Sequence, residues 1–158
     1  MTRVLIAVDG TDRGIEVART AKSLFGDGAH YLAVNCTNVD VSTPFGAVYP
    51  MPELALGLAT AQGGVADEDI TTKAIDTAAE RAGRVALDAG IRAEPVGEIG
   101  DPVTAIVHAA AEHHADVIVV GSRSRSWISR LLEPSVAEGV KRASHVPVLF
   151  VQEHDASS

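Results

Sequence analysis

The stretch from Val117 to Val140 combines residue types that bind phosphate groups. Its apolar run Val117 to Val120 predicts a buried strand, Gly121 begins a loop rich in serine and arginine, and a helix start follows. A strand, a flexible turn and a helix N-terminus in this order bring backbone N–H groups and the positive end of the helix dipole to one place. The loop also adds positive charge to a chain whose formal net charge is −8, through Arg123, Arg125 and Arg130. We therefore predict a phosphate site at the end of this strand.

The spacing of this stretch resembles the signature of the universal stress protein family, which is Gly, two residues, Gly, nine residues, then Gly followed by Ser or Thr. The matching positions are Gly121, Ser124, Pro134 and Ser135, so a serine and a proline stand where the family has its second and third glycines. The resemblance covers essentially the whole chain, from Asp9-Gly10 in the first strand and turn to the Val-Pro-Val-Leu that begins at Val146. It implies a protein that binds an adenine nucleotide.

The chain as a whole predicts strands that alternate with helices. Strands are expected over Arg3 to Val8, His30 to Cys36, Arg92 to Gly97, Val117 to Val120 and Val146 to Val151, and helices over Asp12 to Phe25, Val65 to Ala89, Asp101 to Ala111 and Val136 to Ala143. This pattern predicts an α/β fold, a single-domain doubly wound five-stranded parallel sheet with helices on both faces. The resemblance implies the strand order 3-2-1-4-5 of adenine-nucleotide-hydrolase-like proteins. We expect residues 1–152 to form the domain and residues 153–158 to form a polar tail.

Residues at the ends of two predicted strands would meet in one crevice. In open α/β sheets, ligands bind at the carboxyl ends of the strands where the strand order reverses. The resemblance makes the first and fourth strands neighbours, so Asp9-Gly10-Thr11 and Gly121 to Ser124 would lie together, and the main chain near Val34 would meet an adenine. Two roles are open for Asp9. In the family an aspartate here contacts the nucleotide, while a carboxylate at this position also orders a tight glycine turn or caps the following helix.

Two departures from the motif bear on phosphate binding. Pro134 has no backbone N–H to donate, and Ser124 carries a Cβ where a glycine would let the backbone come close. Ser135 begins an S-x-x-E capping box, so its hydroxyl has two interpretations, a helix cap and the phosphate contact that the family implies. The candidate binding residues are Asp9, Gly10, Val34, Gly121, Ser122, Arg123, Ser124, Ser135 and Val136. We expect them to bind ATP or AMP weakly, with little contribution from the γ-phosphate.

The residue patterns do not predict catalysis. Asp9-Gly10-Thr11 matches the end of the Asp-x-Asp-Gly-Thr motif of haloacid-dehalogenase-type phosphatases, but Ala7 replaces the nucleophilic aspartate. The sequence contains no G-x-x-x-x-G-K-[ST], and no G-x-G-x-x-G follows the first strand. His108 and Glu112 share a helix face, but the two histidines that follow point to different faces, so we predict a solvated helix end and not a metal site. We expect a non-enzyme and leave slow ATP hydrolysis open.

The last predicted strand, Val146 to Val151, is apolar on both faces although it should lie at the edge of the sheet. An unpaired apolar edge is normally covered or paired. The resemblance implies a homodimer in which this strand pairs with its own copy across a two-fold axis. A nucleotide-free dimeric interaction protein, the role of family members that lack the glycine motif, is the alternative function.

Composition limits the surroundings and partners of the chain. An apolar run of ~20 residues and a cleavable leader are both lacking, and Cys36 is the single cysteine, so we expect a cytoplasmic protein with no membrane association. A sequence pI near 5.1 argues against nucleic-acid binding. The segment from Thr37 to Gly64 contains Pro44, Pro50 and Pro52, and it is open to two interpretations, a lid over the crevice and an ordinary surface loop.

Overall fold

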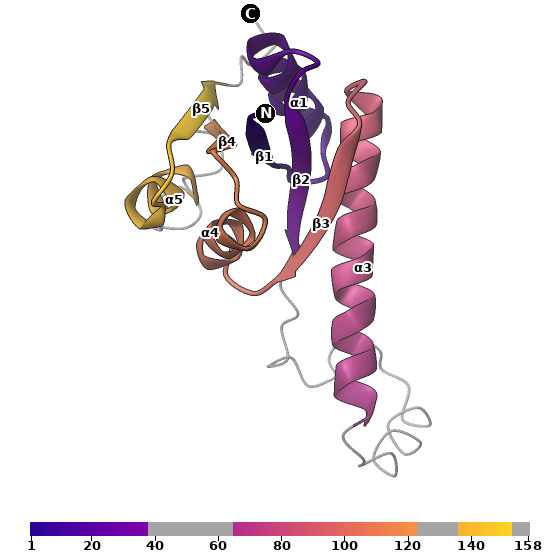
Figure 1. Ribbon diagram of the computed structural model, residues 1–158. Coiled ribbons are helices and arrows are strands. Elements are labelled where there is room, and N and C mark those ends of the chain that lie inside the picture. The colour runs from indigo at the N-terminus through magenta and orange to yellow at the C-terminus, as the bar shows by residue number, and fades with distance from the viewer. Residues whose placement is uncertain (38–64, 123–135, 153–158) are drawn as a thin grey trace, which may run out of the picture.

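The computed structural model describes residues 1–37, 65–122 and 136–152. The strands are β1 (Arg3–Ala7), β2 (His30–Thr37), β3 (Ala93–Ile99), β4 (Val117–Ser122) and β5 (Val148–Gln152), and the helices are α1 (Asp12–Phe25), α3 (Val65–Asp88), α4 (Pro102–Glu112) and α5 (Val136–Ala143). All four strand pairs are parallel, and the order across the sheet is β3-β2-β1-β4-β5 (Figure 1). The predicted α/β class and strand order are confirmed.

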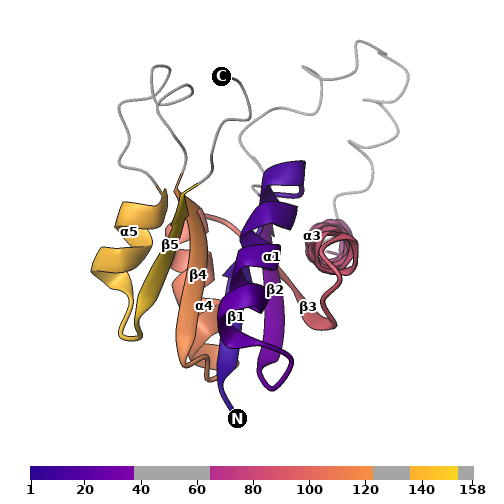
Figure 2. The same ribbon diagram turned by 90° about the horizontal axis from the view of Figure 1, so that it is seen from above.

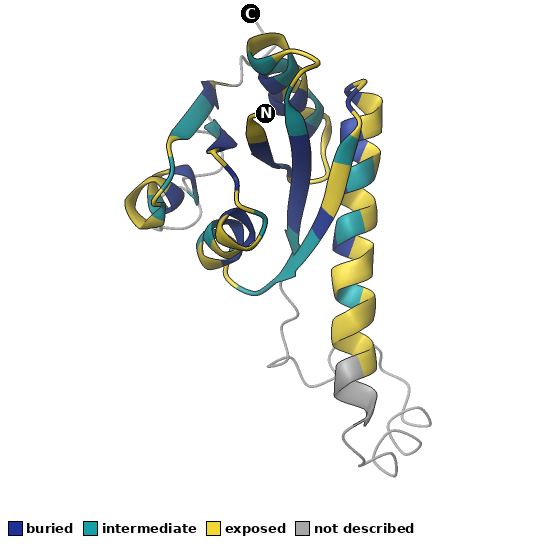
Figure 3. Cartoon of the chain, in the orientation of Figure 1, coloured by how far each residue is buried: buried dark blue, intermediate teal, exposed yellow. Residues whose placement is uncertain are grey.

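The helices cover both faces of the sheet, and each face has its own apolar core. Helices α1 and α3 pack on one face around buried Val4, Ile6 and Ala82, while α4 and α5 pack on the other around Leu5, Ile118 and Val140 (Figures 1 and 2). Because the central strands are buried on both faces, they read as continuous apolar runs and not as an alternating pattern. In Figure 3, β2 is accordingly coloured as buried along most of its length. On the neighbouring strands, Leu5, Ile6 and Ile118 are fully buried.

Helix α3 approaches β3 so closely that one strand position has room only for glycine. A Cβ added at Gly97 would collide with the carbonyl oxygen of Ile75 and would lie 2.9 Å from the backbone nitrogen of Ala79, both on α3. Backbone atoms cannot move aside as a side chain can. The position therefore fixes how α3 lies on the sheet.

Helix α4 begins as the sequence predicts. Asp101 is its N-cap and its Oδ2 accepts hydrogen bonds from the Thr104 backbone nitrogen and hydroxyl, both at 2.9 Å, while Pro102 occupies the first turn. These hydrogen bonds hold the pKa of the Asp101 carboxyl below its usual range, and the bond from the Thr104 backbone nitrogen has the largest effect. The cap anchors α4 directly after β3.

Several predicted strand ends were wrong by one to two residues. Strand β3 begins at Ala93 and runs to Ile99, and β4 continues through Gly121 to Ser122. Strand β5 begins after Pro147, not at Val146, since Ser144 forms hydrogen bonds with both backbone groups of Val146 in a turn. Across the described residues, the helices are too short or too polar to cross a bilayer.

Candidate functional site

The predicted crevice would lie where β1 and β4 are neighbours and the chain direction across the sheet reverses. From β1 the chain crosses through α1 to β2 and then β3, whereas from β4 it crosses through α5 to β5 on the opposite side. The register pairs Val4 with Val117 and Ile6 with Val119. The carboxyl ends of β1 and β4 therefore lie side by side, which is where doubly wound sheets bind ligands.

The turn after β1 is held by Asp9. Its Oδ1 accepts a hydrogen bond from the Thr11 backbone nitrogen at 3.0 Å and another from the Thr11 hydroxyl at 2.6 Å. Gly10 has a φ of +79°, a conformation that favours glycine. The turn-ordering role of Asp9 is thus confirmed, while the N-cap of α1 is Thr11, so the helix-capping alternative was wrong. A nucleotide contact by Asp9 stays a prediction.

The end of β4 differs from the expected loop. Gly121 and Ser122 are strand residues, paired in register with Val151 and Gln152 of β5. The Ser122 hydroxyl donates a hydrogen bond to the carbonyl oxygen of Val151 at 3.3 Å. The prediction that the loop begins at Gly121 was wrong, because the fifth strand continues the hydrogen-bonded ladder by two residues. Gly121 and Ser122 nevertheless lie at the carboxyl end of β4, as the site requires.

Two neighbouring residues of β2 connect to the end of β1. Val34 is buried, and its carbonyl oxygen accepts a hydrogen bond from the Val8 backbone nitrogen at 2.9 Å, so that acceptor is already used within the sheet. The next residue, Asn35, donates from Nδ2 to the carbonyl oxygen of Val8 at 2.8 Å. Asn35 is 4% exposed, and its Oδ1 is buried without a hydrogen-bond partner among the described residues.

The sequence reasoning did not select Asn35. The available signal was a polar amide within the otherwise apolar run of β2, a feature that buried strands rarely carry without a specific partner. By bonding Val8, Asn35 fixes the residue that directly precedes Asp9. It therefore positions the turn that the sequence reasoning did select.

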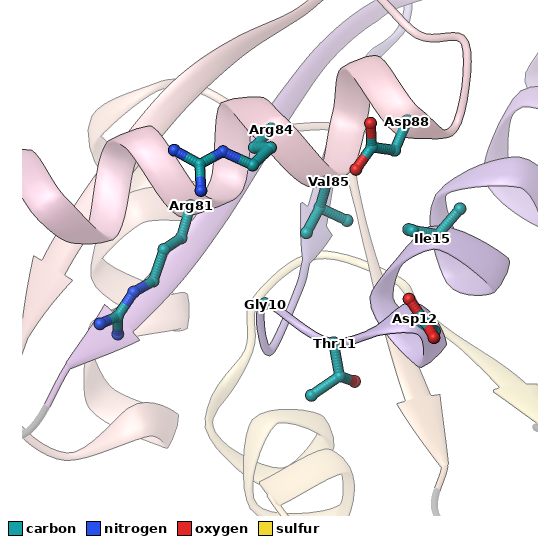
Figure 4. Close-up of a pocket in the computed structure, with 8 residues that line it drawn as sticks. All are labelled: Gly10, Thr11, Asp12, Ile15, Arg81, Arg84, Val85 and Asp88. Atoms are coloured by element: carbon teal, nitrogen blue, oxygen red, sulfur yellow. The ribbon is translucent and has the colours of Figure 1, made fainter.

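A small cavity opens beside the turn, between the start of α1 and the last turns of α3 (Figure 4). Its volume is about 110 Å³, below the several hundred Å³ that a site for a drug-sized ligand needs. The cavity is lined by Gly10, Thr11, Asp12, Ile15, Arg81, Arg84, Val85 and Asp88. The positive charges of two arginines and the negative charges of two aspartates offset each other in this lining. The cavity is therefore not the predicted nucleotide crevice, although it shares Gly10 with it.

The predicted phosphate loop is described only at its two ends. Gly121 and Ser122 close β4, and Val136 begins α5, where it packs half-buried against the core on the α4 and α5 face. Arg123, Ser124, Pro134 and Ser135 lie outside the described residues, as do residues 38–64 and the tail 153–158. Their roles stay predictions.

Cys36 is half-buried near the carboxyl end of β2. Burial, and to a smaller extent the negative charges of Glu98 and Asp101, raise the pKa of its thiol to about 11. Since the thiolate is the reactive form, a thiol with this pKa is a poor nucleophile at neutral pH. Cys36 instead packs against the apolar core on the α4 and α5 face.

These features define a doubly wound α/β protein whose first and fourth strands are neighbours and end at the same edge of the sheet. The chain matches the universal stress protein family over residues 1–152, and it belongs to that family. The universal stress protein YxiE of Bacillus subtilis (strain 168) is 29% identical over 154 residues, which are 95% of this chain and 98% of that protein. The universal stress protein MJ0531 of Methanocaldococcus jannaschii is 28% identical over 151 residues, covering 95% of this chain and 81% of that protein.

Solved structures share the fold. A universal stress protein in complex with cAMP superposes with a TM-score of 0.58 at 24% identity, covering 96% of both chains. The universal stress protein from Archaeoglobus fulgidus in complex with dAMP superposes with a TM-score of 0.50 at 19% identity, covering 95% of this chain and 97% of that one. At these identities the likeness establishes the architecture, which agrees with the strand order of the sheet.

Proposed function

We propose that this chain is a stress-response protein that binds an adenine nucleotide, ATP or AMP, in the crevice between the ends of β1 and β4, without acting as an enzyme. The observation that carries the proposal is the strand order, since it brings the Asp9-Gly10 turn beside Gly121 and Ser122. The complexes of related proteins with cAMP and dAMP support an adenine nucleotide as the ligand class.

The adenine and ribose part of the proposed site is better preserved than its phosphate part. Asp9 sits on an ordered turn, and Asn35 fixes the backbone that leads into it. The phosphate loop carries Ser124 and Pro134 in place of two glycines. A missing backbone donor removes a hydrogen bond to a charged group, which is worth roughly 1.5–3 kcal/mol. We therefore propose weak binding in which the phosphates beyond the first contribute little.

Calorimetric titration with ATP and AMP tests this proposal. The two affinities are expected to differ by less than about tenfold, or ~1.4 kcal/mol. Restoring both glycines, with Ser124→Gly and Pro134→Gly, should tighten ATP binding selectively. Ser126→Gly is the matched control, because it removes a serine from the same loop outside the motif. Tight ATP binding with far weaker AMP binding in the wild type would show that the two glycines are dispensable.

A nucleotide-free interaction protein is the second candidate function, and the serine and proline in the motif favour it. Under this alternative, no adenine nucleotide produces heat in the titration, even after the glycines are restored. A charged or aromatic surface, and not the crevice, would then be the place to look for a partner.

We also propose a homodimer through β5. Leu149 packs toward the α1 and α3 face and Phe150 toward the α4 and α5 face, and both remain half-buried at the edge of the sheet. Light scattering at micromolar concentration should give the mass of a dimer, and Leu149→Glu should dissociate it. Leu24→Glu, at an exposed leucine on α1, is the matched control and should leave the dimer intact. A wild-type monomer would contradict the proposal.

A further inference from the structure

Two carboxylates and one imidazole converge between β3 and α4. His108 and Glu112 are four residues apart on α4, and Glu98 lies near the end of β3. The His108 Nδ1 is 3.3 Å from Oε1 of Glu98 and 3.8 Å from Oε2 of Glu112, and the three ligand atoms all lie within 4.8 Å of one another. The sequence showed the pair on the helix but gave no sign of Glu98, and without a third ligand it predicted a solvated helix end.

The two printed separations from His108 are compatible with ligands around a shared centre. Zinc binds imidazole nitrogen at about 2.0–2.1 Å and carboxylate oxygen at about 2.0–2.2 Å, and a tetrahedral angle then separates two ligand atoms by roughly 3.4 Å. A direct charge-assisted hydrogen bond would instead bring nitrogen and oxygen to about 2.7–2.9 Å. His108 Nδ1 and Glu98 Oε1 form a hydrogen bond of 3.3 Å, longer than this range, and both 3.3 and 3.8 Å lie close to the separation of roughly 3.4 Å between two zinc ligands, so a bound ion would replace that hydrogen bond.

The backbone holds two of the three side chains in place. Glu98 is 17% exposed and sits on a strand in register with Cys36 of β2. The Gly100 backbone nitrogen donates to the carbonyl oxygen of Thr37 at 3.1 Å, and the Asp101 cap then starts α4. The short connection thus fixes His108 relative to Glu98, which reduces the entropy that must be lost when a metal binds.

The charge around the cluster favours a cation. In the part of the chain that the structure describes, no lysine or arginine forms an ion pair with Glu98 or Glu112. A second group, Glu94 with His30 at 3.4 Å and His113 at 3.9 Å, lies elsewhere on β3. It does not bring three ligand atoms within the same distance of one another, so it provides an internal control.

We propose that Glu98, His108 and Glu112 bind one divalent transition-metal ion of the zinc type, with water completing the coordination. Imidazole together with carboxylate suits Zn²⁺, whereas Mg²⁺ prefers oxygen ligands throughout. The ion joins the end of β3 to the second half of α4. Its binding therefore stabilises the contact between sheet and helix on the face that carries α4 and α5.

Calorimetric titration of the metal-stripped full chain with ZnCl₂ tests the site, using protein purified without a histidine tag. One ion per chain is expected at pH 7.5. His108→Gln and Glu98→Gln should each weaken binding at least tenfold, and Glu94→Gln, the same change on the same strand, should not. Co²⁺ in place of Zn²⁺ should give visible absorption that is lost in His108→Gln.

Glu112→Gln keeps the test decisive if Glu98→Gln does not fold, because Glu112 is 59% exposed and its replacement does not disturb the core. Three outcomes would overturn the proposal. These are no saturable binding up to about 1 mM Zn²⁺, equal binding by the wild type and all the variants, and a loss of binding in Glu94→Gln that matches the loss in Glu98→Gln.

Discussion

Replacing Gly97 with alanine is expected to lower the free energy of unfolding by about 3 kcal/mol, the upper end of what overpacking usually costs. The added methyl group would collide with the carbonyl oxygen of Ile75 and crowd the backbone nitrogen of Ala79, so α3 must move away from β3. In a chain of this size, the expected loss corresponds to a fall in Tm of roughly 6–12 °C.

Gly83→Ala is the matched control, since it makes the same change inside α3, where the nearest contact of the new Cβ would be the side chain of Pro95 at 3.4 Å. A glycine in the middle of a helix costs about 0.5–1 kcal/mol relative to alanine, so this variant should be as stable as the wild type or more stable. Urea unfolding followed by circular dichroism measures both. Equal midpoints for Gly97→Ala and the wild type would show that α3 does not pack against β3 as closely as described.

The sequence predicted the architecture but not this contact. Apolar runs and helix start signals are local patterns, and they identified all five strands and the helices of the described chain. The requirement for glycine at position 97 arises from a helix that begins some thirty residues earlier in the chain, and a sequence read locally carries no sign of it. The ends of β4 and β5 were missed for the same reason, because each strand is extended by pairing with the other.

For the candidate site, too, the sequence predicted the local turn but not the contacts between elements. Asp9, Gly10 and Thr11 form a local turn whose residue types are typical of turns, and the structure confirms it. The hydrogen bond from Asn35 to Val8 depends on how β1 and β2 pair, and the position of the second carboxylate, Glu98, near His108 depends on how α4 packs against β3. Both are tertiary features, so they became visible only when the elements were brought together.

Replacing Asp9 with alanine is expected to weaken ATP and AMP binding alike, by about 10- to 100-fold. The reason is that a carboxylate at the end of β1 would accept hydrogen bonds from the ribose or adenine, which both nucleotides share, and hydrogen bonds to charged groups are worth roughly 1.5–3 kcal/mol. The same substitution removes the two hydrogen bonds from Thr11, so the stability of the fold should also fall, by about 1–2 kcal/mol.

Asp9→Asn separates these two effects. An asparagine Oδ1 can still accept both hydrogen bonds from Thr11, so stability should stay within about 0.5 kcal/mol of the wild type, while the loss of negative charge should still weaken both nucleotides by about tenfold. Asp12→Asn is the matched control, because it removes an acidic charge three residues away, in the cavity between α1 and α3. Calorimetric titration and urea unfolding of the four proteins measure the two quantities independently. If Asp9→Ala lost stability but bound AMP as the wild type does, the carboxylate would serve the turn alone, and the adenine nucleotide would have to be held by the other residues at the ends of β1 and β4.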